Sequence, residues 1–556
     1  MLTNKELANL IFPEVKGSVE ELEKRYPKRD LKEGAEVTRF APSPTGFLHT
    51  GSLFTSMICH KFAHQSGGVF YVRLEDTDTK RGIAGSGEQL LDQLKIFNIV
   101  PDEGYLGDHE KGSYGPYIQS NRADIYRIVI KHLLEEGKAY PDFCTAEELE
   151  EIRKEQEAKK LLPGYYGEFA RDRHLNNDQR AKLIEEGKPY VIRFKSNGNH
   201  ENKIHVKDLI RGEFDIMEND QDIVIYKSDG LPTYHFAHAC DDHFMRTTTV
   251  IRGEEWIASL PIHIQLFESL GWEAPRYAHL PVICKLDEVG HKRKLSKRLD
   301  SEAAVSFFLE DGYPPEALIM YLMTIANSNF EEWILNNKFE HMEDFVLTFN
   351  KFSSEGALFD MGKVNFFARE ILVKKNKEEI YLLAKEYAKK YKPELLEMIE
   401  RDPEYFKAIM NIEREKENPR KDYEKFGNLV ELIGFFYPDK YDALLLKGFE
   451  YNPKFQNSDI ALVLENLRDK LSLQQDEQSW FNNMKEIGIS LGFAGNNKEY
   501  KANPEAFKGS IGDVAEILRI TLSGRKNSPN LYYVMQVLGV EESHRRMDEV
   551  IKLMKK

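Results

Sequence analysis

Cysteine is scarce in this chain of 556 residues, which contains only four. Cys59, Cys144, Cys240 and Cys284 stand far apart in the sequence, so they form neither a disulfide framework nor a sequence-local metal motif. Isolated cysteines of this kind are typical of buried thiols in a reducing compartment. We therefore expect a cytoplasmic protein that is not held together by disulfides.

Long apolar segments and an excess of basic residues are also missing. No run approaches the ~18 apolar residues of a membrane-spanning helix, and the first residues, M-L-T-N-K-E-L, lack the charged-then-apolar pattern of a secretion signal. The 92 acidic residues outnumber the 77 Lys and Arg, which gives a formal net charge of −15. This balance weakly disfavours a nucleic-acid partner, but basic faces can coexist with an acidic body.

What is present is the composition of a folded protein. Hydrophobic residues make up 41% of the chain and aromatic residues 11%, which excludes a disordered polypeptide. At roughly 100–200 residues per domain, this length predicts about three to five domains.

The chain is organised around residues 39–52, R-F-A-P-S-P-T-G-F-L-H-T-G-S. A short buried strand is expected over 35–39, and apolar residues at helical spacing predict a helix after the segment. A strand, a tight loop and a helix start form a natural polyanion site, because free N–H groups and the helix dipole face the ligand. His49, where the helix begins, could donate to a phosphate without a permanent charge, although such a histidine is more often a capping or surface group.

A second segment, residues 292–298, reads K-R-K-L-S-K-R. Alone, a basic heptamer is usually a solvated loop or a nucleic-acid patch. Together, H-T-G-S at 49–52 and K-L-S-K-R at 294–298 resemble the paired H-I-G-H and K-M-S-K-S signatures of class I aminoacyl-tRNA synthetases. Five segments narrow the resemblance to the glutamyl-tRNA synthetase family, namely R-F-A-P-S-P-T-G at 39–46, V-R-L-E-D-T-D at 72–78, G-P-Y-I-Q-S-N-R at 115–122, K-S-D-G-L-P-T-Y-H at 227–235 and V-I-R-G-E-E-W at 250–256.

The resemblance implies an α/β fold with a Rossmann-like class I catalytic domain, an α/β insertion, and α-helical stem-contact and anticodon-binding domains. A strand over 69–75 should complete a right-handed parallel βαβ unit with the first strand and its helix. We expect helices at 122–136 and 145–159 and a strand at 190–195 in the insertion, and we expect the catalytic sheet to resume near 223–227.

Six parts are expected along the chain. Residues 1–34 would form an N-terminal surface extension with one or two helices. The catalytic domain would comprise residues 35–100 and 207–292, separated by an insertion at 101–206 that grips the tRNA acceptor end. A stem-contact domain with the K-L-S-K-R loop would follow at 293–370, and an α-helical anticodon-binding region at 371–556. Past about Phe366 nearly every segment has a helical pattern. This favours the glutamyl branch, because the glutaminyl branch ends in β-barrels.

The resemblance also implies an amino-acid pocket whose residues are Arg39, Ala41, Ser43, Glu75, Tyr234, His238 and Arg252. Arginine offers only donors in a planar fork that suits a carboxylate, so Arg39 and Arg252 would bind glutamate. Glu75 would contact the substrate amino group. His238 stands where relatives carry Asn, and it is either a pocket contact or a packed group behind the pocket.

The expected ATP site consists of His49, Gly51, Ser52, Glu255, Trp256, Lys294, Leu295, Ser296 and Lys297. Ser52 replaces the last histidine of the H-I-G-H motif. Because adenylate formation builds charge on phosphorus, the catalyst needs placed positive charge rather than a general base. His49, Lys294 and Lys297 are therefore the expected catalytic residues. ATP would be a substrate, with Mg²⁺ held mainly by its phosphates.

Contacts to tRNA are expected at Arg81 and at Arg420, which is a candidate for reading the last anticodon base. In some relatives the insertion binds zinc through several cysteines and a tyrosine. Here only Cys144 falls on such a position, while Asp142 and Phe169 stand where other cysteines align. One thiol does not make a structural zinc site, so no metal ligands are expected.

The implied enzyme is a glutamate–tRNA ligase. It would form glutamyl-adenylate from glutamate and ATP and transfer the glutamyl group to the 2′-hydroxyl of the terminal adenosine of tRNA(Glu), as a monomer. Four alternatives stay open: an enzyme that also charges tRNA(Gln) with glutamate, a glutaminyl-tRNA synthetase, a tRNA-modifying paralogue that glutamylates queuosine, and a small-molecule adenylylating or non-catalytic RNA-binding protein. The last two fit poorly with a helical C-terminal half and intact motif residues.

Overall fold

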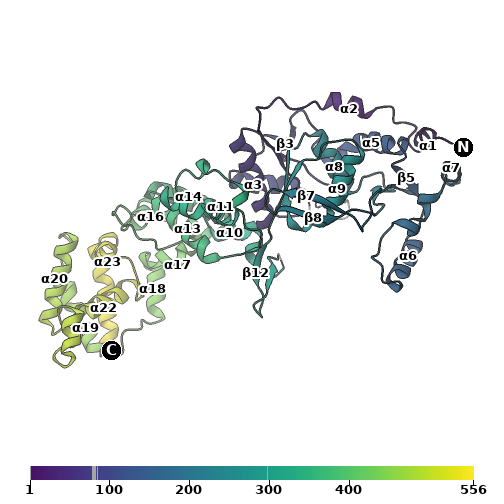
Figure 1. The fold of residues 1–556 in the computed structure, drawn as a ribbon. Helices are drawn as coiled ribbons and strands as arrows, with labels where there is room; N and C mark the ends of the chain where they lie inside the picture. Colours follow the sequence, from purple (N-terminus) through teal and green to yellow (C-terminus); the bar gives the residue numbers. More distant parts are fainter. Residues whose placement is uncertain (1, 45, 78–82, 84, 297) are drawn as a thin grey trace. The chain divides into compact units, whose positions relative to one another are not determined.

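A computed structural model describes the chain except for residues 1, 45, 78–82, 84 and 297. It divides into two compact units (Figure 1). Unit 1 contains Met1–Phe307 and Ile319–Asp360, and unit 2 contains Phe308–Leu318 and Met361–Lys556. The described strands are β1 Val37–Phe40, β2 Val69–Val72, β3 Glu103–Tyr105, β4 Glu110–Lys111, β5 Ala139–Asp142, β6 Val191–Phe194, β7 Lys203–Asp208, β8 Gly212–Met217, β9 Val224–Tyr226, β10 Thr249–Gly253, β11 Arg276–Leu280, β12 Ile283–Leu286, β13 Lys292–Lys294 and β14 Ala357–Leu358.

Helices connect these strands and form nearly all of unit 2. Up to residue 360 they are α1 Asn4–Ile11, α2 Val19–Arg25, α3 Thr50–Ser66, α4 Ser86–Ile96, α5 Ala123–Glu135, α6 Ala146–Ala158, α7 Asn177–Glu185, α8 Tyr234–Phe244, α9 Leu260–Ser269, α10 Val305–Asp311, α11 Pro315–Ala326 and α12 Phe330–Asn336. After it come α13 Met361–Lys374, α14 Lys377–Tyr391, α15 Pro393–Arg401, α16 Pro403–Met410, α17 Leu429–Ile433, α18 Pro438–Leu446, α19 Asn457–Lys470, α20 Glu477–Ser490, α21 Asn497–Ala502, α22 Ile511–Ser523 and α23 Leu531–Met554.

The predicted βαβ unit is present as β1, α3 and β2. The two strands pair in parallel, with Val37 opposite Val69, and β2 pairs in parallel with β3. All four residues of β1 are buried, as expected for a strand covered on both faces. Helix α3 ends at Gly67, which takes a left-handed conformation with φ 69°. Glycine adopts this conformation without steric cost, so the chain can turn directly into β2.

A second parallel pair, β10 and β11 with α9 between them, lies next to the first. Thr248 N–H donates to the Val37 carbonyl, and Arg39 in β1 reaches the Ile251 carbonyl in β10, so β1 and β10 run side by side in the same direction. The chain therefore leaves β1 towards β2 on one side and resumes with β10 on the other. In doubly wound sheets, ligands bind at the carboxyl ends of the strands at such a reversal.

The strand expected at 223–227 forms as β9, but the prediction that it belongs to the catalytic sheet is wrong. β9 pairs antiparallel with β6 in the small sheet β5-β6-β9 of the insertion. Instead, β7 joins the sheet that contains β10 and β11, where its Asp208 pairs with Tyr277 of β11. A short apolar run shows that a strand forms, but its partner strand is far away in the sequence and leaves no local signal.

The N-terminal extension, for which one or two helices are predicted, forms two, α1 and α2. It is more deeply packed than a surface segment, because Ala8, Phe12, Leu22 and Tyr26 are buried in the same hydrophobic core as α5 and α8. The Tyr26 hydroxyl donates to the Gly115 carbonyl at 2.9 Å. These apolar residues are too few and too spread out to show a core pattern in the sequence.

The described part of unit 2 consists of helices and the loops that connect them, with no strand, as the sequence predicts. Figure 1 shows α19, α20, α22 and α23 together in one bundle, and their apolar faces share one core. The helix expected at 423–436 is reduced to α17, with a single 3₁₀ turn on each side.

Candidate active site

A cleft of about 640 Å³ opens in unit 1 at the carboxyl ends of β1 and β10. It is lined by thirteen of the residues predicted for the two substrates, namely Arg39, Ala41, Ser43, His49, Gly51, Ser52, Glu75, Tyr234, Arg252, Glu255, Trp256, Lys294 and Leu295. His238 and Ser296 are not among the lining residues. Lys297 and Arg81 lie outside the described residues.

His49 caps the helix that begins at the cleft. Its Nδ1 accepts a hydrogen bond from the backbone N–H of Gly51 at 2.9 Å, and its own backbone is extended. A neutral imidazole that accepts at Nδ1 carries its proton on Nε2. His49 therefore has the capping role that the sequence offers as the alternative to phosphate binding, and this bond places the proton of a neutral ring on Nε2.

Lys294 also lines the cleft, at the end of β13. Its Nζ is 3.1 Å from Glu255 Oε1, and both side chains are about half exposed. The loop that follows is anchored by Asp300, which accepts from Arg293 NH1 at 2.6 Å and from the backbone N–H of Ser296 at 2.9 Å. The hydrogen bond from the Arg293 guanidinium holds the pKa of Asp300 far below its usual range, although burial acts in the opposite direction.

Arg39 belongs to a buried network of charges. Its Nε donates to Asp242 Oδ1 at 3.1 Å, and Arg73 NH1 donates to the same oxygen at 2.8 Å. Burial alone would raise the pKa of Asp242, but the two guanidinium groups hold it well below the usual value, so the carboxylate stays charged. The other end of Arg73 donates to Glu75 at 2.9 Å. Burial raises the pKa of Glu75.

Arg252 differs from Arg39 in its partners. Its Nε donates to His279 Nε2 at 3.0 Å, and its NH1 donates to His263 Nδ1 at 3.1 Å. The guanidinium also stands 4.9 Å from the ring of Tyr277. Within the described chain, no carboxylate forms an ion pair with Arg252, although the residue is only 5% exposed. A buried arginine without a counter-charge in a cleft is suited to an anionic ligand.

His238 lies behind the cleft rather than in its wall. It is fully buried, its Nδ1 stands 2.8 Å from Asp242 Oδ2, and its ring stacks on Tyr234. Burial lowers the pKa of His238 to about 3, so the imidazole is neutral. This geometry corresponds to the packed alternative, in which His238 supports Tyr234 and Asp242.

Sequence reasoning missed several buried groups around these arginines, notably Arg73, Asp208, Asp242, His263 and His279. One local signal was available, since His238 and Asp242 are four residues apart and so share one face of α8. His279 and Asp208 are 71 residues apart, and no local pattern links them.

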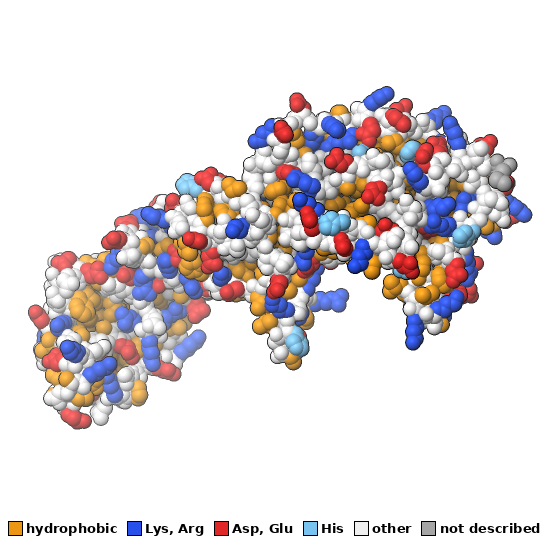
Figure 2. All heavy atoms as spheres, in the orientation of Figure 1, with side chains coloured by type: hydrophobic (Ala, Val, Ile, Leu, Met, Phe, Trp, Pro, Cys, Tyr) orange, Lys and Arg blue, Asp and Glu red, His pale blue; other side chains and the backbone are white. Residues whose placement is uncertain are grey.

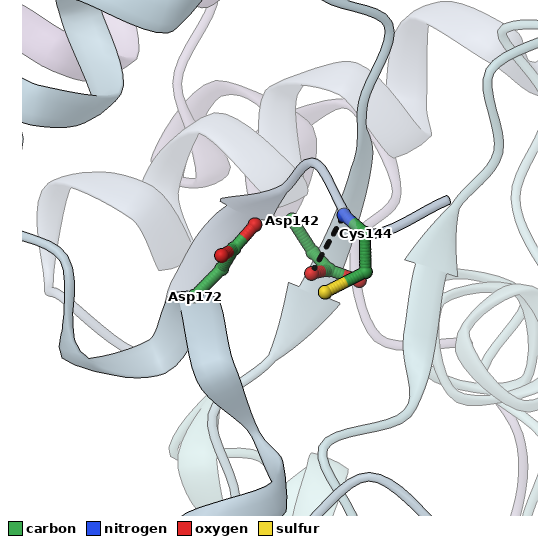
Figure 3. A group of neighbouring side chains, drawn as sticks. All are labelled: Asp142, Cys144 and Asp172. Carbon is green, nitrogen blue, oxygen red and sulfur yellow. Dashed lines mark hydrogen bonds between the residues drawn. The ribbon is translucent and has the colours of Figure 1, made fainter. Parts of the chain in front are cut away.

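The insertion brings together the three side chains Asp142, Cys144 and Asp172 (Figure 3). Cys144 Sγ also lies 3.3 Å from the hydroxyl of Tyr165. Asp142 already accepts from Arg193 Nε at 2.6 Å. Burial raises the pKa of the Cys144 thiol to about 12, which disfavours the thiolate that zinc requires. The set offers one sulfur and hard oxygens already bonded to protein donors, which is a poor fit to zinc.

Arg420 lies in unit 2, beside a second cavity of about 260 Å³. Arg414, Arg525, Phe435 and Phe436 line the same cavity. Arg420 donates to Asp422 through two guanidinium nitrogens, with Nε 2.9 Å and NH2 2.7 Å from Oδ1. Phe435 and Phe436 are buried and stack on each other, so the charged groups among the described lining residues of this cavity are Asp422 and the three arginines. On the face drawn in Figure 2, blue basic and red acidic side chains are interspersed, so basic sites are local features of an acidic chain.

Two known protein families match this chain. The family described as "tRNA synthetases class I (E and Q), catalytic domain" matches residues 36–365, and "Anticodon binding domain" matches 379–551. A glutamate–tRNA ligase of Clostridium perfringens (strain SM101 / Type A) is 46% identical over 548 residues, covering 98% of this chain and 99% of the relative. The chain belongs to the glutamate–tRNA ligases. Their class I catalytic and anticodon-binding parts therefore account for both units.

Other members of this ligase family support the same assignment. The glutamate–tRNA ligase of Acetivibrio thermocellus is 43% identical, covering 98% of this chain and 100% of the relative. The crystal structure of a glutamate tRNA ligase from Elizabethkingia meningosepticum in complex with its amino acid has a TM-score of 0.72 at 30% identity, covering 94% of this chain and 100% of that one. Among the described helices, none combines the length and the apolar character that crossing a membrane requires.

Proposed function

We propose that the cleft in unit 1 forms glutamyl-adenylate and then passes the glutamyl group to tRNA. As a glutamate–tRNA ligase, the chain is an ATP-dependent enzyme whose partners are tRNA, glutamate and ATP. The observation that carries the proposal for the cleft is Arg252, whose buried guanidinium pairs with no carboxylate of the described residues. A carboxylate of glutamate would supply the missing charge.

Five further residues complete the proposed amino-acid site. Arg39 would bind the second carboxylate of glutamate, although Asp242 already shares its charge. Glu75 would accept from the substrate ammonium group, a role that favours its charged form and so opposes the effect of burial on its pKa. The Tyr234 ring, 4.3 Å from that of Trp256, would close one side, and Ala41 and Ser43 would contact the backbone part of glutamate.

The phosphate groups of ATP would lie between the start of α3 and the β13 loop. His49 would donate from Nε2, and Lys294 and Lys297 would supply positive charge as the α-carboxylate attacks the α-phosphate and pyrophosphate leaves. Lys294 would exchange its partner Glu255 for a phosphate. The nucleotide would lie against Gly51 and Ser52, which line the cleft, and the remaining ATP contacts would come from Glu255, Trp256, Leu295 and Ser296.

Magnesium would be carried by ATP rather than held in a protein cage. Of the described residues that line the cleft, only Glu75 and Glu255 are carboxylates, and each pairs with a cation. This donor set fits an ion bound by one or two carboxylates together with substrate phosphates. When bound, the ion would offset part of the phosphate charge.

In the second step the 2′-hydroxyl of the terminal adenosine would take the glutamyl group. Arg81 would contact the acceptor end, and Arg420 would pair with an anticodon base in exchange for Asp422. tRNA(Glu) is the proposed substrate, and tRNA(Gln) is a second candidate because few contacts in unit 2 would separate the two. We further propose a cytoplasmic monomer.

Pyrophosphate exchange tests the reaction. The purified chain should exchange labelled pyrophosphate into ATP with glutamate and not with glutamine, measured with and without tRNA. Charging of purified tRNA(Glu) and tRNA(Gln) then defines the tRNA partner. Equal exchange with glutamine would support a glutaminyl enzyme, and no exchange with either amino acid would refute the proposal.

A matched pair of variants tests the anticodon assignment. Arg420→Gln should raise the KM for tRNA(Glu) by at least about tenfold, which corresponds to roughly 1.4 kcal/mol. The KM for glutamate should not change, because Arg420 belongs to unit 2 and the cleft lies within unit 1. Arg401→Gln is the control, since this arginine also pairs with an acid in unit 2, Asp439, but does not line the second cavity.

A further inference from the structure

We infer that His263 and His279, with Asp208 behind His279, are positioning residues that fix the Arg252 guanidinium while leaving its charge for the substrate. The inference rests on the proposed role of Arg252 in binding a glutamate carboxylate. All three groups are nine-tenths or more buried, and they come from α9, β11 and β7, so they meet only in the folded chain.

The first contact fixes the tautomer of His279. Arginine has only donors, so His279 Nε2 must accept from Arg252 Nε, at 3.0 Å. The ring proton is then on Nδ1, which donates to Asp208 Oδ2 at 2.7 Å. Asp208 is itself held, because it accepts from the backbone N–H groups of Ile210 and Arg211, each at 2.9 Å. The imidazole therefore cannot rotate without losing bonds on both sides.

His263 is held in the same way. Its Nδ1 accepts from Arg252 NH1 at 3.1 Å, so its proton is on Nε2 and points at His235 Nδ1, 3.0 Å away. Burial lowers the pKa of His279, and it lowers that of His263 well below the usual value, so both rings keep the lone pair that Arg252 needs. The hydrogen bonds from Arg252 to His263 and from His263 to His235 therefore run in one direction, each with one donor and one acceptor.

The choice of histidine matters for charge. Arg39 and Arg73 are held by the carboxylate of Asp242, which offsets part of their charge. Arg252 is held by two neutral rings and, at 3.4 Å, by the Trp256 carbonyl. These bonds occupy three of the five N–H donors of a guanidinium, so two donors and the full charge stay available to a substrate carboxylate. A carboxylate at either histidine would compete with glutamate.

Paired substitutions test this inference in the full-length enzyme. Asn at 263 and Gln at 279 can place an amide oxygen where the ring nitrogen accepts, whereas Leu cannot accept. In glutamate-dependent pyrophosphate exchange with tRNA(Glu) present, His263→Leu and His279→Leu should raise the KM for glutamate by about tenfold or more. His263→Asn and His279→Gln should recover most of this loss, and the KM for ATP should stay within about twofold in all four variants.

A charged variant and a control complete the test. His279→Glu should raise the KM for glutamate above that of His279→Gln, because the new carboxylate neutralises Arg252. His243→Leu is the control, since this largely buried histidine of unit 1 stacks on Trp272 and lies outside the cleft. If a Leu variant does not fold, as judged by its melting temperature, the comparison of Gln with Glu at 279 still decides.

Two different results would distinguish a failure of the positioning role from a failure of the proposed function. Leu variants with the glutamate KM of the wild type, or Gln and Glu variants at 279 with equal KM, would overturn the positioning role. A wild-type enzyme without glutamate-dependent exchange would instead refute the proposed function itself, before any variant is compared.

Discussion

Replacing Arg252 by glutamine should abolish most of the use of glutamate while leaving ATP binding nearly intact. Arg252 is 5% exposed, and its guanidinium donates to His263, His279 and the Trp256 carbonyl, so a bound carboxylate would pair with it away from water. Glutamine at 252 keeps some hydrogen bonds but has no charge, so a substrate carboxylate would be buried without its partner.

The magnitude follows from this burial. Breaking a buried pair by removing one partner costs about 3–5 kcal/mol. At 1.36 kcal/mol per factor of ten, this loss corresponds to a fall in kcat/KM for glutamate of roughly 150- to 5,000-fold. The assay is pyrophosphate exchange with tRNA(Glu), with glutamate and ATP varied in turn. The wild type should in addition reject glutamine, because an amide NH₂ facing Arg252 sets donor against donor.

Arg276→Gln is the matched control for this experiment. Arg276 begins β11, beside β10, but its side chain is half exposed and pairs with Glu36 away from the cleft. This variant should keep the kcat/KM of the wild type within about twofold. If kcat/KM for glutamate fell by less than about tenfold in Arg252→Gln, Arg252 would not bind the substrate carboxylate. Comparable pyrophosphate exchange of the wild type with glutamine and glutamate would lead to the same conclusion.

Three further predictions concern the loop, the insertion and pH. Lys294→Ala should slow exchange by at least about tenfold with an unchanged KM for glutamate, because its charge acts mainly on the transition state; Lys292→Ala, with a rate equal to the wild type, is the control. Elemental analysis should find no stoichiometric zinc, because Arg193 already pairs in the insertion cluster, and one zinc per chain that resists dialysis would contradict this. The melting temperature should fall as the pH drops from about 6.5 towards 3, because His238 has a pKa of about 3 in the fold and ~6.5 in the unfolded chain, which therefore binds more protons in this window. The fall between about pH 7 and about pH 5, followed by circular dichroism, should be smaller in His238→Gln than in the wild type.

The family, the fold class and most residues of the cleft were predictable from the sequence. Residues 39–52 and 292–298 are contiguous segments in which loop, helix start and basic side chains follow one another, so their pattern is local and visible. The βαβ unit and most helices were predictable for the same reason, because the spacing of apolar residues reports the nearest neighbours along the chain.

The surroundings of these motifs become visible only in the folded chain. It placed β9 in the sheet of the insertion, brought Asp172 beside Asp142, and put His279 and His263 against Arg252. A hydrogen bond depends on distance and direction in space, and a strand partner or a histidine far along the chain has no fixed spacing that a sequence pattern could reveal. The sequence could therefore name the arginine that should meet the substrate, whereas only the fold shows which neutral groups hold that arginine in place.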